Sequence, residues 1–294
     1  MVVRVITGVV GAAVILLLLS LPQPWPLIPL AAGWVAALWE FGRLRRQGAG
    51  TLLTIGAIHL ALIWIGNLAF LVAYPHISDH LHLALVSFYG LLVVFQLLFA
   101  DMVLTAWHRN PERRLQNTLW HSFLFITLPL YVVYVESSFG PLMVLVVLGI
   151  AWAGDTGAML SGKLLGRRLI TPKVSPHKSL EGAIGGWAAI LVFLLMTKCF
   201  AGVAFGRPCN LLELGGLPST LVTIGITALL ALWFAIVGFM GDITFSAFKR
   251  AGGVKDFSSL VPGHGGVLDR IDSLLFVIPS YFLCITLFSD ALFI

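Results

Sequence analysis

The sequence predicts an all-α, polytopic integral membrane protein with about nine transmembrane helices. Hydrophobic residues make up 59% of the 294 residues, and charged residues only 11%. Apolar runs of roughly 20 residues, the length that crosses a bilayer as a helix, recur along the whole chain. Lys and Arg residues fall mainly in alternate connections between these runs, as they do when one side of the membrane is cytoplasmic.

The apolar runs predict helices at residues 5–21, 25–42, 52–73, 82–107, 117–135, 140–161, 183–203, 219–244 and 271–292. The first run could pass for a signal peptide, but no small-residue cleavage site follows it, so we expect an uncleaved helix. We expect residues 1–140 to be a scaffold of membrane helices. Residues 141–294 carry the stretches that suggest chemistry.

The positions of Lys and Arg predict the orientation. With a cytoplasmic N-terminus, all 18 of these residues except Lys198 and Arg207 lie in cytoplasmic segments. One missed or surplus helix would reverse every later connection, so nine helices place the C-terminus outside. Glu40, near Arg43 at an inner helix end, is expected to be a paired side chain at the membrane surface.

Charge and cysteine content exclude two other classes. The net charge of +5 does not indicate a nucleic-acid-binding protein, because the basic residues are spread over short connections. Three cysteines, Cys199, Cys209 and Cys284, have no metal-ligand spacing and indicate no disulfide framework.

One polar stretch, residues 153–182, suits a phosphate-rich ligand. It contains Asp155 and then basic residues with Ser175, Lys178 and Ser179, which can supply charge-assisted hydrogen bonds to phosphate. Ser175 and Pro176 are predicted to begin the next helix, with Glu181 in its first turn. A loop that only orients the helices is an equally good interpretation of this stretch alone.

A second polar stretch, residues 241–273, concentrates charge between two apolar runs. On a helix, Asp242 and Ser246 share a face, and Asp269 and Asp272 do so at the next helix start. If the intervening turn brings these helices together, three carboxylates converge. Mg²⁺ would compensate them, because it prefers one or two carboxylates with water and phosphate oxygens. The alternative is a set of surface ion pairs, Asp256 with Lys255 and Asp269 with Arg270.

Two motifs carry a family resemblance. The pattern Ser246-x-x-Lys249-Arg250-x-x-x-x-Lys255-Asp256, followed by His264-Gly265-Gly266-x-x-Asp269-Arg270-x-Asp272, resembles the signature of bacterial phosphatidate cytidylyltransferases, the CDP-diacylglycerol synthases. The run Ser175-Pro176-x-Lys178-Ser179-x-Glu181-Gly182 resembles a second family element, and the segment around Asp155 is similar to a third. Together these matches cover the C-terminal half.

The resemblance implies that phosphatidate and CTP give CDP-diacylglycerol and pyrophosphate with Mg²⁺, a second cation being left open. The implied catalytic residues are Asp242, Lys249, Asp256 and Asp269, and the implied metal ligands are Asp242, Asp269 and Asp272. The implied substrate-binding residues are Ser175, Lys178, Ser179, Glu181, Ser246, Arg250, Lys255, His264 and Arg270. The expected location is the bacterial inner membrane, in contact with the lipid bilayer, with the active site facing the cytoplasm. A homodimer is left open.

Phe245 stands where many family members have Glu, and this departure leaves open a catalytically weak paralogue. The alternatives are a CTP-dependent lipid-alcohol kinase, a transporter of an anionic substrate, and a catalytically weak paralogue that binds lipid.

Overall fold

The computed structural model describes residues 141–172, 174–204, 220–251, 253–261 and 265–292, together with Leu17 and residues 32–33, 35–37 and 39–40. The helices predicted at 52–73, 82–107 and 117–135 lie outside these residues. Leu17 and the described residues between 32 and 40 are helical, in agreement with the first two predicted helices.

The C-terminal half is helical where it is described. Its helices are α6 (Pro141–Leu165), α7 (Leu180–Ala204), α8 (Thr220–Ala251), α9 (Leu268–Ile271) and α10 (Leu274–Leu292). These confirm the predicted helices at 140–161, 183–203, 219–244 and 271–292 to within a few residues, except at the end of α8. The described residues contain two isolated β-bridges and no β-strand.

Three stretches of the described helices are long and apolar enough to cross a membrane: Leu145–Leu165, Leu180–Cys199 and Ile224–Arg250. This confirms the membrane class that the composition predicts. The count of nine and the orientation of the termini depend on residues outside the described ranges, so they stay predictions.

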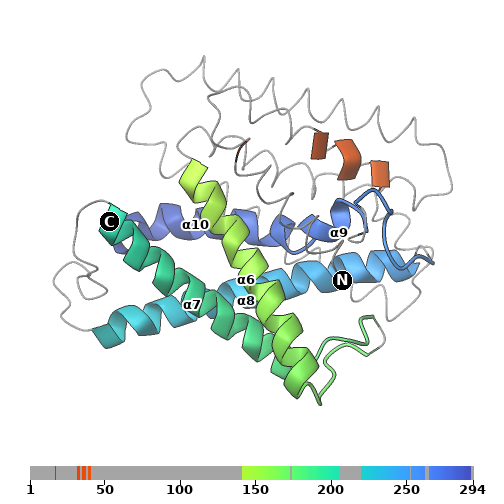
Figure 1. The fold of residues 1–294 in the computed structure, drawn as a ribbon, viewed down its shortest axis with the longest axis horizontal. Helices are drawn as coiled ribbons and strands as arrows, with labels where there is room; N and C mark the ends of the chain where they lie inside the picture. Colours follow the sequence, from red (N-terminus) through yellow and green to blue (C-terminus); the bar gives the residue numbers. More distant parts are fainter. Residues whose placement is uncertain are drawn as a thin grey trace.

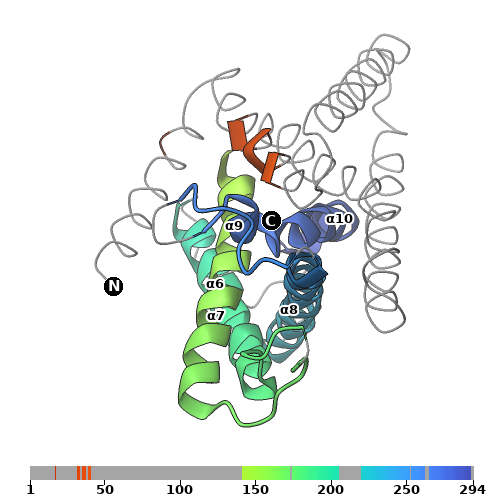
Figure 2. The same ribbon diagram turned by 90° about the vertical axis from the view of Figure 1, so that its right-hand side faces the viewer.

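Helices α6 and α7 pack as a tight antiparallel hairpin that crosses α8 and α10 (Figure 1 and, turned by 90°, Figure 2). Small residues allow this contact. A Cβ atom on Gly157 would lie 2.6 Å from the carbonyl oxygen of Gly185, and one on Gly185 would lie 1.9 Å from Ser161 Oγ. Backbones approach this closely where van der Waals packing holds membrane helices together.

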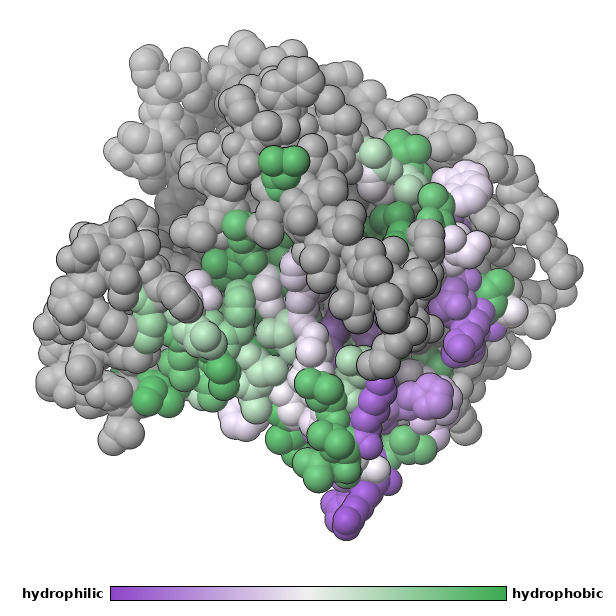
Figure 3. Space-filling model, viewed as in Figure 1, coloured by the Kyte–Doolittle hydropathy of each residue, from purple (hydrophilic) through white to green (hydrophobic). Residues whose placement is uncertain are grey.

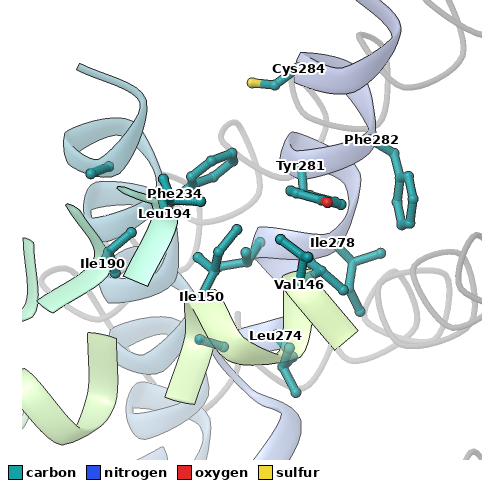
Figure 4. Packing of buried hydrophobic residues seen from close by; sticks show 14 residues of the cluster. Val146, Ile150, Ile190, Leu194, Phe234, Leu274, Ile278, Tyr281, Phe282 and Cys284 are labelled. Carbon is teal, nitrogen blue, oxygen red and sulfur yellow. The ribbon is translucent and has the colours of Figure 1, made fainter. Parts of the chain in front are cut away.

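A hydrophobic core joins α10 to α6, α7 and α8 (Figure 4). Tyr281 on α10 is 2% exposed, and its ring centroid lies 6.1 Å from that of Phe234 on α8. The buried core also includes Val146, Ile150, Ile190, Leu194, Leu274 and Ile278. This packing fixes the start of α10, where Asp272 and Ser273 precede the helix.

Helix α8 continues beyond residue 244, where the apolar run was predicted to end. The additional turns carry Lys249 and Arg250 in the last turn, while Ala247 and Phe248 on the same segment are buried. Hydropathy falls there, but residues 243–248 are all buried, and this tertiary packing keeps the segment helical. Figure 3 shows hydrophilic residues near the end of α8 and near the α6–α7 connection, and hydrophobic residues over the neighbouring helices.

Candidate active site

A cavity of about 700 Å³ opens between α6, α7, α8 and the segment around α9. One part of its wall is apolar and includes Ile150, Ile190, Leu232, Phe234 and Phe239. The other part is charged. Of the described residues, five carboxylates and three cations line it: Asp155, Asp242, Asp256, Asp269 and Asp272 with Lys178, Lys249 and Arg270.

Most of the predicted site residues meet in this cavity. Ser175, Lys178, Ser179, Asp242, Lys249, Asp256, Asp269, Arg270 and Asp272 line it, and so do Asp155 and His177. Glu181, Ser246, Arg250 and Lys255 are not among the lining residues, and His264 lies outside the described residues. The fold thus joins the two polar stretches, in which Lys178 and Asp242 lie 64 positions apart.

Lys178 connects the α6–α7 loop to α8. Its ammonium group donates a hydrogen bond to Asp242 Oδ2 and lies 4.7 Å from the centroid of the Phe239 ring. The Lys178 side chain is 16% exposed and that of Asp242 is 32% exposed. The pair therefore sits in the cavity wall, accessible to a ligand.

Lys249, in the last turn of α8, forms the second charge centre. Its Nζ lies 2.8 Å from Asp269 Oδ1 and 3.9 Å from Asp272 Oδ2. Helix α8 thus presents Asp242 and Lys249 to partners from two different segments. The alternative in which Asp269 forms a surface ion pair with Arg270 is not what the structure shows, because the ion pair of Asp269 is with Lys249.

Asp269 also braces the loop before α9. Its Oδ2 accepts hydrogen bonds from the backbone N–H groups of Phe257 and Gly266, both at 2.9 Å. Gly265 turns the chain at this point with φ +87°, a conformation that glycine adopts at little cost. The Asp269 side chain is only 3% exposed.

Asp155 on α6 reaches the same site. Its Oδ2 lies 3.5 Å from Ser273 Oγ, a hydrogen bond that links α6 to the start of α10. Its charge interacts with those of Asp242 and Lys178. Four segments far apart in sequence therefore contribute charge to one cavity.

The structure corrects the predicted helix start at Ser175. Helix α7 begins at Leu180, and Ser179 Oγ accepts a hydrogen bond from Gly182 N at 3.1 Å, which makes Ser179 the N-cap. Glu181 does lie in the first turn, as predicted. Its carboxylate accepts hydrogen bonds from the backbone N–H groups of Arg167 and Arg168, so it fastens the chain that follows α6.

Phe245, the departure from the family pattern, lies in an aromatic cluster beside the loop that carries Asp256. Phe245 is 1% exposed, and its ring packs near Phe248 and edge-on against Phe257, with centroids 6.1 and 6.2 Å apart. Phe245 is not among the described cavity-lining residues. Through Phe257 it supports the loop that carries Asp256.

The role of Glu40 was missed from the sequence. Glu40 is fully buried, not a surface side chain, and accepts hydrogen bonds from Ser258, Val267 and Leu268. The only sequence signal was an ionisable residue near the end of an apolar run. Its partners lie more than 200 positions away, and no local pattern predicts them.

The donor chemistry of the cavity fits a hard divalent cation. Carboxylate oxygens are the preferred protein ligands of Mg²⁺, which usually keeps several positions for water and phosphate oxygens. The lining carries five carboxylates and three cationic side chains, so its net charge is negative. A phosphate ligand would therefore need an added cation to bind there. Within the described residues, no three His, Cys, Asp or Glu side chains are grouped closely enough to hold one ion alone.

Comparison with known proteins shows the family to which the chain belongs. The chain matches the model of the cytidylyltransferase family over residues 2–288. It is 35% identical to the phosphatidate cytidylyltransferase of Haemophilus influenzae, over 95% of this chain and 97% of that one. It is 31% identical to the phosphatidate cytidylyltransferase of Bacillus subtilis, over 97% and 98% of the two chains.

A third relative, Escherichia coli "Uncharacterized protein YnbB", is 44% identical over 49% of this chain and 42% of its own. The family match covers nearly the whole sequence, and two relatives align with this chain from end to end. The chain belongs to the cytidylyltransferase family.

Proposed function

We propose that the chain is a phosphatidate cytidylyltransferase, which transfers CMP from CTP to phosphatidate and releases pyrophosphate. The observation that carries the proposal is the mixed lining of the cavity. A wall of apolar residues from α6, α7 and α8 continues into the cluster around Lys178 and Lys249. A lipid that ends in a phosphate matches both parts of this lining at once.

The charged part of the cavity suits the second substrate, CTP. Lys178 and Lys249 each carry three N–H donors, and each lies beside a carboxylate that holds it in place. Arg270, also in the lining, adds a planar donor group suited to phosphate. We assign these three residues to the phosphates of CTP and phosphatidate. Arg250 and Lys255 are exposed and would act at the rim.

The reaction needs positioning and charge neutralisation more than a protein nucleophile. A lipid phosphate oxygen forms a bond to the α-phosphorus of CTP. The bond from that phosphorus to the oxygen bridging to the β-phosphate breaks, and pyrophosphate leaves with the electron pair. Lys178 and Lys249 would stabilise the negative charge that develops on the phosphate oxygens.

A divalent cation completes the proposed site. Asp242 and Asp269 would hold Mg²⁺, with Asp272 in support, and phosphate oxygens of the substrates would fill other positions. When bound, the ion neutralises phosphate charge and makes pyrophosphate a better leaving group. Asp256 would position the nucleotide or the neighbouring Lys255.

We also propose that the cavity opens toward the cytoplasm from the bacterial inner membrane, where CTP is available. The distribution of Lys and Arg over alternate connections supports this orientation. The N-terminus would then be cytoplasmic and the C-terminus outside. Nine helices and a homodimer stay predictions.

Product analysis tests the activity. Purified protein is incubated with CTP, Mg²⁺ and either phosphatidate or diacylglycerol in mixed micelles. The proposal predicts pyrophosphate release that requires phosphatidate, because diacylglycerol lacks the attacking phosphate. CDP release with diacylglycerol would instead identify a CTP-dependent lipid-alcohol kinase, and no turnover with either lipid would contradict both enzymes.

A further inference from the structure

Glu40, from the N-terminal half of the chain, bridges two parts of the connection that leads from α8 into α9. Glu40 Oε1 accepts hydrogen bonds from Ser258 Oγ at 2.6 Å and from Val267 N at 2.8 Å. Its Oε2 accepts one from Leu268 N at 2.7 Å. One carboxylate therefore holds Ser258, within this connection, to Val267 and Leu268 at its end.

The surrounding residues are shaped for this bridge. A Cβ atom on Gly266 would lie 2.6 Å from Glu40 Oε2 and 2.7 Å from Oε1, so a larger residue would collide with the carboxylate. Leu268, which donates to Glu40, is itself fully buried. An unpaired N–H group at this position would have no water to replace its partner.

The bridge bears directly on the cavity. Val267 and Leu268 immediately precede Asp269, whose carboxylate binds Lys249 on one side and Phe257 N and Gly266 N on the other. Two carboxylates thus hold this segment: Asp269, which lines the cavity, and Glu40, from the N-terminal half of the chain. Moving Leu268 moves Asp269 and Arg270, which line the cavity.

We propose that Glu40 is a positioning residue for the reaction: it sets the place of Asp269 and Arg270 by holding the loop between Phe257 and Leu268. This inference rests on the proposed function. Glu40 belongs to the first 140 residues, which were expected to be only a scaffold, so the proposal gives a residue of that region a direct part in building the site.

The substitution Glu40→Gln tests the proposal with little change in size. A glutamine has one acceptor oxygen where Glu40 has two, so its NH₂ group must face either the donors of Val267 and Ser258 or the N–H group of Leu268. We expect hydrogen exchange of the backbone amides in residues 257–268 to rise by about 10-fold or more, because charge-assisted hydrogen bonds are lost. Exchange in α10 should not change.

Kinetics of the same variant form the second readout. A displacement of reacting groups by about 1 Å can cost about 10²-fold in rate. We therefore expect Glu40→Gln to lower kcat for pyrophosphate release by about 10–100-fold in protein that is still folded at the assay temperature, although its melting temperature falls because buried hydrogen bonds are lost.

Two serine variants serve as controls, one with a smaller expected effect and one with none. Ser258→Ala removes only one of the three donors, so we expect about a 5-fold effect on loop exchange. Ser259→Ala changes the exposed neighbour and should leave exchange and turnover unaltered.

The proposal is overturned if Glu40→Gln leaves exchange of residues 257–268 unchanged, or if its loss of activity only follows a loss of folded protein. Hydrogen exchange can be measured without turnover, so it tests the role of Glu40 separately from the proposed function. Absent pyrophosphate release in the unchanged protein would refute the proposed function, and exchange would still decide the role of Glu40.

Discussion

Replacing Asp269 by Asn should lower both stability and activity. Asp269 accepts three hydrogen bonds in the structure: Lys249 Nζ at 2.8 Å on Oδ1, and Phe257 N and Gly266 N, each at 2.9 Å, on Oδ2. Asparagine has one acceptor oxygen. In either orientation its NH₂ group faces at least one of these donors, and the charge opposite Lys249 is lost.

The magnitude follows from burial. The side chains of Lys249 and Asp269 are 12% and 3% exposed, so this pair is nearly removed from solvent. Breaking one partner of a buried pair costs about 3–5 kcal/mol. Asp242 is a matched comparison, because it also pairs with a lysine but is 32% exposed. Asp242→Asn should cost only about 0–1 kcal/mol.

Activity should respond differently from stability. If Asp242 and Asp269 hold Mg²⁺, both variants lose about 10²-fold or more in rate, since changes around ligands alone cost about 10–100-fold. Unfolding titrations in mixed detergent micelles measure the stability difference, and rates at rising Mg²⁺ measure the metal dependence. Equal stability of Asp269→Asn and Asp242→Asn would show that the hydrogen bonds of Asp269 do not stabilise the loop. An unchanged Mg²⁺ requirement in either variant would refute the assignment of that residue as a metal ligand.

Three further predictions test other parts of the account. Lys178→Met should lower kcat/KM for CTP by about 10²-fold in a steady-state assay, because one donor to the phosphates is lost. Gly185→Ala should destabilise the α6–α7 hairpin by about 1–3 kcal/mol in the same unfolding titrations, because its Cβ would lie 1.9 Å from Ser161 Oγ. A reporter that is active only outside the cytoplasm should be active after Ile294 and inactive after Gly48.

Each of these predictions has a contrary result. Normal CTP kinetics in Lys178→Met would show that the loop carrying Lys178 only orients the membrane helices. Gly225 on α8 is the control for Gly185, since a Cβ atom on Gly225 would meet nothing within 4 Å, and Gly225→Ala should not destabilise the protein. An inactive reporter at Ile294 would contradict the nine-helix topology.

Hydropathy predicted α6, α7 and α10 because each depends mainly on a local run of apolar residues. The end of α8 could not be predicted in this way. Its last turns carry Lys249 and Arg250, which lower hydropathy, while the buried Phe245 packs against Phe257, beyond the end of the helix. The break between α9 and α10 likewise depends on tertiary contacts.

The candidate site was predictable in its residue types but not in its pairing. Motif and helix spacing predicted that Asp242, Lys249 and Asp269 belong to one site, and all three line the cavity. Which lysine faces which carboxylate depends on how helices pack, and Lys178 meets Asp242 across 64 positions. Glu40 was assigned to the surface because its partners, Ser258 and Leu268, lie in a segment far along the chain.

The central claim is that CMP passes from CTP to the lipid phosphate, and the fate of two labels tests it most directly. Purified protein receives phosphatidate, Mg²⁺ and CTP labelled either at the α-phosphate or at the γ-phosphate. The account predicts α-label in the extracted lipid and γ-label in pyrophosphate. Label from the γ-phosphate in the lipid, or no label in the lipid from either position, would contradict it.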